Sequence, residues 1–241
     1  MKAVLRHELH SYFTTPVGYI FLAMYTLLAG VVYVFINIGQ EASASMNLMF
    51  SGMQLPLMLI APLLTMRLFA EERRMRTDQL LFTMPVRISA VVLGKTLAAV
   101  LMLLFSMGLT VLFPLVISRW AQVSAAQMAA TYLGYFLHGA ALISMGVLVS
   151  SLCVNQVSAA VITLGVNVFL YMNEHYILPQ MSAGYLAPVR TLLQWLPGTQ
   201  RLGDFSGGVI SLADVVYFLL FAALMVFFTC RVLTARRYEK G

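Results

Sequence analysis

The sequence predicts an all-α polytopic membrane protein, because of its composition and the length of its apolar segments. Hydrophobic residues make up 61% of the 241 residues, and the mean hydropathy is +0.86. A soluble domain of this size could not bury that much apolar surface. No polar segment is long enough to enclose a core of its own, so we expect residues 1–241 to form a single transmembrane domain.

Six apolar segments are predicted to cross the membrane. They comprise residues 17–36, 51–70, 90–117, 127–151, 155–172 and 210–231. The first would form a helix of about 30 Å, at about 1.5 Å per residue, which matches the thickness of a bilayer core. It is longer than the apolar core of a signal peptide, so we expect it to be retained. The third is longer than a bilayer requires, which indicates tilt.

The predicted orientation follows from the basic residues. Twelve of the 15 lysine and arginine residues precede the first span, surround the loop between spans two and three, or follow the sixth span. Cytoplasmic loops of membrane proteins are enriched in Lys and Arg, so both termini are predicted to be cytoplasmic. The same bias explains the net charge of +6, and no nucleic-acid partner is expected.

Two further segments are predicted to lie at the membrane surfaces. Residues 2–15 carry Leu5, Leu9 and Tyr12 at helical spacing, which indicates an amphipathic helix in the plane of the cytoplasmic interface, in contact with membrane lipids. The alternative is a loose N-terminal tail. Residues 173–209 form the long outer loop, in which 186–196 is apolar enough for a second in-plane or re-entrant helix.

Charged residues are concentrated between the second and third spans. Residues 71–85 are predicted to form a cytoplasmic segment. The helix of the second span is predicted to continue into this segment, from Phe69 to Leu81. In that helix Glu72 and Arg76 are four residues apart and can pair, as can Glu71 and Arg74, which are three apart.

A less charged stripe, formed by Met75, Gln79 and Phe82, could enter a groove on a soluble partner, and Pro85 ends the segment. The alternative is an ordinary loop whose positive charge only orients the protein.

The sequence offers few groups that could perform catalysis. Gly94-Lys95-Thr96 lacks the further glycine of a phosphate-binding loop, so Lys95 is expected to extend to the cytoplasmic interface. His138 has no carboxylate in its own span, and we expect it to hydrogen-bond to a neighbouring helix. Glu174 and His175 are adjacent outside span five but point to different faces of a helix. The chain is therefore predicted not to be an enzyme.

Three blocks of the sequence carry a resemblance to a known family: residues 8–19, residues 62–73 with 80–86 and 93–95, and residues 203–218. They resemble the membrane permeases of ABC-2 type transporters, particularly the gliding-motility GldF-like branch and its NosY-like relatives. Residues 8–19 are similar to the family's approach to span one. Residues 62–73, followed by 80–86 and 93–95, are similar to its most characteristic segment. Residues 203–218 resemble its last outer loop and final span.

The resemblance implies a type V ABC-exporter-like architecture, in which an in-plane N-terminal helix, six spans and two short cytoplasmic coupling helices contact an ABC ATPase subunit. The first coupling helix would correspond to residues 71–83, and the second to the turn at residues 153–156. The interface with the ATPase implied in this way comprises Arg67, Glu71, Glu72, Arg73, Arg74, Met75, Arg76, Thr77, Asp78, Gln79, Phe82, Thr83, Pro85, Asn155 and Gln156.

The resemblance also implies the function and its partners. The chain would be the permease subunit of an ATP-driven transporter in the bacterial cytoplasmic (inner) membrane, paired with a second permease, identical or related. ATP and Mg would be bound by the ATPase, with no cofactor or metal in this chain. The output would be export, or force delivered to an extracytoplasmic partner. The alternative is a non-enzymatic membrane scaffold that recruits cytoplasmic proteins through the charged 67–85 loop.

Overall fold

The computed structural model describes residues 1–35, 46–76, 87–113, 125–180, 187–198 and 200–239. Within these ranges the chain is helical and contains no strand. Six of the helices in the described ranges are long and apolar enough to cross a membrane, which confirms the predicted all-α polytopic class. They are α2 (Pro16–Tyr33), α3 (Met46–Thr65), α6 (Ile88–Thr110), α8 (Ala125–Leu152), α9 (Gln156–Met172) and α13 (Leu212–Glu239).

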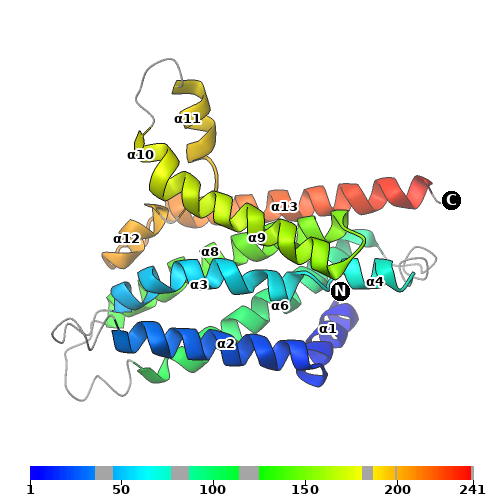
Figure 1. The fold of residues 1–241 in the computed structure, drawn as a ribbon, viewed down its shortest axis with the longest axis horizontal. Helices are drawn as coiled ribbons and strands as arrows, with labels where there is room; N and C mark the ends of the chain where they lie inside the picture. Colours follow the sequence, from blue (N-terminus) through cyan, green and yellow to red (C-terminus); the bar gives the residue numbers. More distant parts are fainter. Residues whose placement is uncertain (36–45, 77–86, 114–124, 181–186, 199, 240–241) are drawn as a thin grey trace.

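The N-terminal residues form a helix, α1 (Lys2–Thr14), which runs steeply across the axis of α2 in Figure 1. Pro16 is the first residue of α2. An N–H group at this position would have no intrahelical partner, so the helix loses nothing by having a proline there. The corner requires glycine at position 18, because a Cβ atom there would lie 2.1 Å from the carbonyl oxygen of Tyr12. The alternative of a loose N-terminal tail is therefore wrong.

Helix α8 is the most buried of the six spans and packs against α3, α6, α9 and α13. A hydrogen bond joins α9 to α3 at a proline. Pro62, inside α3, has no N–H group, so the carbonyl of Met58 lacks its intrahelical partner. The amide of Asn167, on α9, donates to that carbonyl at 2.8 Å. A neighbouring helix thus satisfies the backbone group that the proline leaves free, as proline within a span requires.

The charged segment begins with α4 (Ala70–Arg74), separated from α3 by a turn at residues 66–69. The chain then leaves the helical conformation, since Arg76 has φ 58°, in the left-handed region. The predicted continuous helix from Phe69 to Leu81 is therefore wrong, because helix α4 ends at Arg74. Residues 77–86 lie outside the described part of the chain.

At the other end of the bundle, a π-helical turn (Asn173–Ile177) extends α9. Figure 1 shows α10 (Leu178–Gln180) and α11 (Ala187–Gln194) projecting sideways from the bundle there. The chain returns through a 3-10 turn (Gln200–Leu202) and α12 (Gly203–Ser206) to α13.

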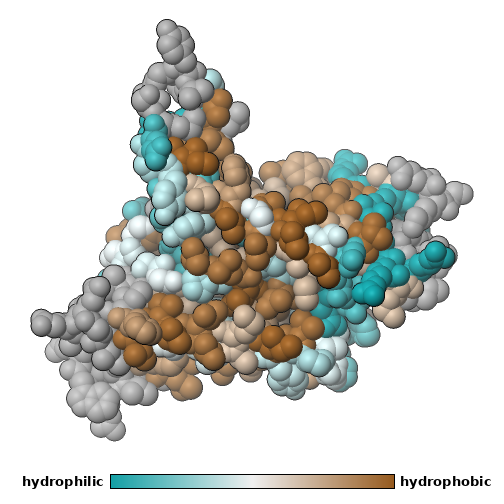
Figure 2. Space-filling model, viewed as in Figure 1, coloured by the Kyte–Doolittle hydropathy of each residue, from teal (hydrophilic) through white to brown (hydrophobic). Residues whose placement is uncertain are grey.

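Polar residues gather at the end of the bundle formed by α1, α4, the turn between α8 and α9, and the last turns of α13. We call this the basic end. Figure 2 shows hydrophilic residues concentrated there, whereas apolar residues cover the flank formed by α2 and α9. Helix α13 continues past the predicted limit of the sixth span, residue 231, and reaches the basic end as a helix.

Candidate functional site

The start of α4 is fixed by a side chain from α8. The hydroxyl of Ser150 accepts hydrogen bonds from the backbone N–H groups of Phe69 and Ala70, both at 3.3 Å. The same hydroxyl donates to the carbonyl of Met66 at 3.2 Å. The first N–H groups of a helix have no intrahelical partner, so Ser150 both caps α4 and attaches it to the central helix of the bundle.

Lys95, on α6, lies at the centre of a buried ionic cluster. Its side-chain nitrogen is 2.7 Å from a carboxylate oxygen of Glu8, on α1, and 2.8 Å from one of Glu72, on α4. It also lies 5.3 Å from the centre of the Phe69 ring. Lys95 is only 2% exposed, so the prediction that it extends to the interface is wrong. Two carboxylates from other helices provide partners nearer than solvent, and the cluster joins α1, α4 and α6.

Arg67 attaches the same segment to the N-terminal corner. Its guanidinium donates to the hydroxyl of Thr15 at 2.7 Å and to that of Ser11 at 2.8 Å. It pairs with Glu71 at 3.5 Å and lies 5.7 Å from the centre of the Tyr12 ring. The Arg67 side chain is 14% exposed. Its bonds are therefore directed into the protein, and Glu71 pairs with Arg67 where the sequence predicted Arg74.

Tyr12 connects α1 to the end of α3. Its hydroxyl donates to the carbonyl of Leu64 at 2.6 Å, and the side chain is buried. Burial, reinforced by the negative charge of Glu8, raises the pKa of the Tyr12 phenol far above its usual value. The phenol therefore stays protonated and remains a hydrogen-bond donor to α3 at physiological pH.

Arg73 connects α4 to the turn between α8 and α9. Its guanidinium donates to the carbonyls of Leu152 at 3.1 Å and of Cys153 at 3.3 Å. Arg236, on α13, donates to the carbonyls of Ser151 and Leu152. The last carbonyls of a helix lack intrahelical partners and carry partial negative charge. Two arginines from different helices thus meet the C-terminal end of α8.

The turn between α8 and α9 contains no helix of its own, so the second coupling helix implied at residues 153–156 is wrong. The turn is short because Asn155 caps α9 directly, its side-chain oxygen accepting from the N–H of Val157 at 3.1 Å. Gln156 is the first residue of α9. Leu152 and Val154 are 52% and 56% exposed, so the turn presents an apolar surface at the basic end.

Three consecutive residues point away from the protein at the end of α4. Arg74 and Arg76 are exposed, and Met75 between them is 67% exposed. The segment therefore has two sides: Arg67, Glu72 and Arg73 bond to the bundle, and residues 74–76 are open to a partner. The remaining predicted contacts, namely Thr77, Asp78, Gln79, Phe82, Thr83 and Pro85, lie outside the described residues.

Sequence reasoning missed Glu8, Ser150 and Arg236 as members of this site. A signal for Glu8 exists, since it is the only acidic residue before the first span and Lys95 is a cation within an apolar segment. Nothing local distinguishes Ser150 from the other hydroxyls of α8. In the sequence, Arg236 is one of several basic residues after the last predicted span. It reaches α8 only because α13 continues as a helix to Glu239.

The candidate catalytic groups elsewhere in the described residues are dispersed. His138 is fully buried, and among the described residues neither ring nitrogen has a hydrogen-bond partner, so the predicted bond to a neighbouring helix is wrong. Its ring packs edge-on against Phe218, with centroids 5.9 Å apart. Glu174 is buried, whereas His175 is exposed and stacks on Tyr171. Within the described ranges, no three His, Cys, Asp or Glu side chains are grouped as metal ligands.

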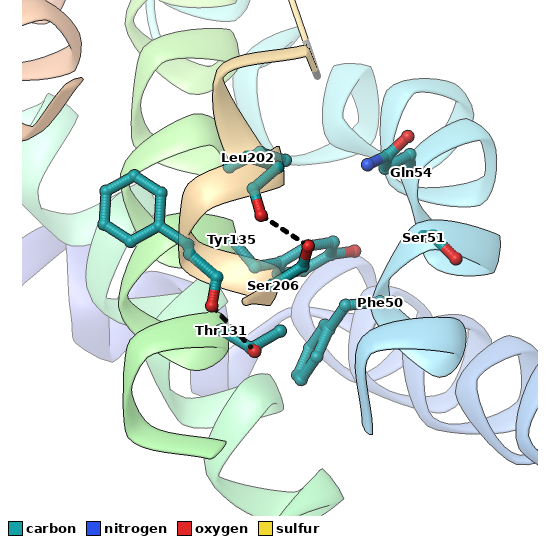
Figure 3. A pocket seen from close by; sticks show the side chains of 9 residues that line it. Phe50, Ser51, Gln54, Thr131, Tyr135, Leu202 and Ser206 are labelled. Carbon is teal, nitrogen blue, oxygen red and sulfur yellow. Dashed lines mark hydrogen bonds between the residues drawn. The ribbon is translucent and has the colours of Figure 1, made fainter. Parts of the chain in front are cut away.

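A small cavity of about 210 Å³ lies between α3, α8 and α12 (Figure 3). Phe50, Ser51 and Gln54 of α3 face Tyr135 and Thr131 of α8 across it. Its described lining carries no charge. Ligand pockets usually measure about 300–1,000 Å³, so we assign it no ligand.

The fold and the basic end define a class of protein: a multi-pass membrane subunit whose charged segment is attached to several spans and open on one side. Comparison with protein families identifies the family of the chain. Residues 31–200 match the model of the ABC-2 family transporter protein, and the chain belongs to that family. None of the curated proteins compared with the chain matches it significantly. Membership confirms the resemblance at the level of the family, and implies a permease that pairs with an ABC ATPase subunit.

Proposed function

We propose that this chain is the permease subunit of an ATP-driven transporter, and that residues 74–76, at its basic end, dock the separate ATPase. One observation carries the proposal: Arg74, at the end of α4, and the following residues Met75 and Arg76 are exposed, while the other side of α4 is bonded to α6 and α8. ATP and Mg are bound by the ATPase, whose hydrolysis drives export or delivers force to an extracytoplasmic partner. Within the family we place the chain in the GldF-like and NosY-like branch.

The attachments of α4 make it suitable for transmitting movement. Coupling between the ATPase and the spans requires a set of contacts that moves as a unit and a protein with two alternative conformations. A displacement of α4 by the ATPase would act on α6 through Glu72 and Lys95, and on α8 through Arg73 and Ser150. It would also act on α1 through Glu8. Two copies of such a permease, identical or related, would then move around a shared cavity.

The proposed location is the bacterial cytoplasmic membrane, with the basic end and both termini on the cytoplasmic side. Arg67, Arg73, Arg236 and Lys95 all bond at this end, and positive residues favour the cytoplasmic face. This is also the side on which a soluble ATPase meets the membrane. Multi-pass insertion itself follows from the six apolar helices and the family.

The test is coexpression of the full chain with the ABC ATPase encoded beside it, followed by purification and measurement of ATP hydrolysis. We expect a stable complex with both subunits present in equal numbers. The double variant Arg74→Glu/Met75→Asp should insert normally, because both side chains are exposed. It should fail to copurify the ATPase, since charge and apolar contact are both removed from the docking surface.

The matched control is Arg237→Glu, which reverses an exposed charge at the same end of the bundle but on α13. It should retain the ATPase. If the wild-type chain binds no ATPase, or if the α4 variant binds it as well as the control does, the proposal is wrong. In that case a scaffold that recruits other cytoplasmic proteins through the 67–85 segment becomes the better hypothesis.

A further inference from the structure

The exposed face of α1 carries basic side chains that the protein itself does not neutralise. Lys2, Arg6 and His10 recur every fourth residue and form one stripe along the helix, with His7 beside it, and all four are exposed. Among the described residues, none of the four takes part in an ion pair. The only acidic residue of α1, Glu8, points to the other face, where it pairs with Lys95.

An apolar stripe lies beside the basic one. Leu5, Leu9 and Phe13 are also spaced by four residues, and together with the basic residues they line an open depression of about 810 Å³. Leu5 and Leu9 are partly buried against the cluster of buried side chains that includes Tyr12 and Leu64. The apolar stripe therefore lies at the edge of the helix bundle. The depression is therefore lined by basic side chains on one side and by apolar side chains on the other.

The apolar stripe continues onto a span. Phe13 contacts the ring of Phe105, on α6, edge to face with centroids 5.7 Å apart. Phe105 belongs to an exposed apolar row that includes Leu97 and Leu101, which are 39% and 36% exposed, whereas Phe105 is 49% exposed. A spanning helix with such a row faces lipid chains. The depression on α1 thus opens onto a surface that contacts the bilayer interior.

We propose that this depression binds an anionic phospholipid of the adjacent leaflet, the phosphate lying on Lys2, Arg6 and His10 and one acyl chain along Leu97, Leu101 and Phe105. Long basic side chains at a membrane boundary extend their cations to the headgroup level while their stems cover apolar surface. Basic residues beside a membrane surface attract anionic lipids. A bound lipid would hold α1, and through Glu8 it would hold the cluster around Lys95 and Glu72.

A soluble partner fits the surface less well. An acidic protein could neutralise Lys2 and Arg6, but it could not cover the row on α6, which faces the bilayer interior. Charge and apolar surface are satisfied together only by a molecule with both a phosphate and a hydrocarbon chain. The inference does not depend on the proposed docking of the ATPase, because α1 and α4 expose different side chains.

The test is native mass spectrometry of the full chain, delipidated in detergent, with phosphatidylglycerol and phosphatidylcholine of identical acyl chains. We expect phosphatidylglycerol to be retained in preference to phosphatidylcholine. The variant Lys2→Gln/Arg6→Gln should bind phosphatidylglycerol about thirtyfold more weakly, at about 1 kcal/mol for each basic residue near an anionic surface. Arg231→Gln/Arg237→Gln is the matched control, since it also removes two exposed cations, on α13. It should bind phosphatidylglycerol as the wild type does.

Four outcomes would overturn the inference. Equal retention of the two lipids by the wild type would show that charge plays no part. An equal loss in the α1 and α13 variants would show an effect of net charge alone. Displacement of the lipid by millimolar inorganic phosphate would show an anion site without a chain. If the α1 variant keeps its lipid but loses the ATPase, the face is a protein-docking surface and the lipid proposal is wrong.

Discussion

The side-chain nitrogen of Lys95 lies 2.7 Å from a carboxylate oxygen of Glu8, although 87 residues separate them in the sequence. Glu72 lies 2.8 Å from the same nitrogen. Burying a charge costs desolvation free energy unless the charge forms an ion pair. The ammonium group of Lys95 forms ion pairs with two carboxylates. The position of α4 therefore depends on α1 and α6 as well as on the span that precedes it.

The first prediction concerns the charge of Lys95. Lys95→Met should lower the free energy of unfolding by about 3–5 kcal/mol, because it leaves the carboxylates of Glu8 and Glu72 close together without a cation. The thermal unfolding midpoint in detergent measures this. The triple variant Lys95→Met/Glu8→Gln/Glu72→Gln should recover most of the loss. A single variant as stable as the wild type would show that the cluster contributes no net stability.

The second prediction concerns the transmission of movement through Arg73. Arg73→Ala removes the bonds to the carbonyls of Leu152 and Cys153 but leaves the exposed residues 74–76 in place. We expect the ATPase to remain associated, while its rate of hydrolysis no longer responds to the permease. ATP turnover of the purified complex, compared with that of the isolated ATPase, measures the response.

Arg73→Lys serves as the conservative comparison, since it keeps the charge but replaces the guanidinium with an ammonium group on a shorter side chain. It should restore part of the response. A complex with Arg73→Ala that hydrolyses ATP like the wild type would show that α4 transmits nothing to the turn between α8 and α9.

The class of fold was predictable because a membrane span is a local feature. About twenty apolar residues are needed to cross a bilayer, and such runs can be counted in the sequence. The continuation of α13 to Glu239 could not be recognised in this way, because its last turns are polar. They are stabilised by bonds from Arg236 to the end of α8, about 85 residues away.

The candidate site was predictable only in part, for a related reason. The sequence located the charged segment, since its composition contrasts with the apolar flanks. It did not show which side chains face the bundle, because that depends on the end of α4 at Arg74 and on partners far along the chain. Lys95 is the clearest case: taken alone it resembles an interfacial lysine, and only the placement of Glu8 and Glu72 accounts for its burial.

The third prediction tests the packing of α8 against α3. A Cβ atom at Gly146 would lie 2.5 Å from the hydroxyl oxygen and 2.9 Å from Cβ of Thr65, at the end of α3. Gly146→Ala should therefore lower the free energy of unfolding by about 1–3 kcal/mol, despite the better helix propensity of alanine. Gly165→Ala on α9 is the control, because nothing lies within 4 Å of the added atom. Equal midpoints for the two variants would contradict the close approach.

The fourth prediction concerns His138. A buried polar group without a hydrogen-bond partner is unfavourable, and both ring nitrogens of His138 lack one among the described residues. His138→Leu should raise the free energy of unfolding by about 1 kcal/mol and leave ATP turnover of the complex unchanged. His175→Leu, at an exposed position, should also leave ATP turnover unchanged. A loss of turnover in His138→Leu alone would mean that the imidazole takes part in transport.

The hydrogen bond from Asn167 to the carbonyl of Met58 predicts a non-additive pair of substitutions. Asn167→Leu removes the donor from α9, so it should lower the free energy of unfolding by about 0.6–2 kcal/mol. Pro62→Ala supplies a backbone N–H group within α3 that can bond the same carbonyl. In that background Asn167→Leu should cost much less, and a double-mutant cycle of thermal unfolding in one detergent measures the difference. Additive costs would show that the amide does not replace the missing helical bond.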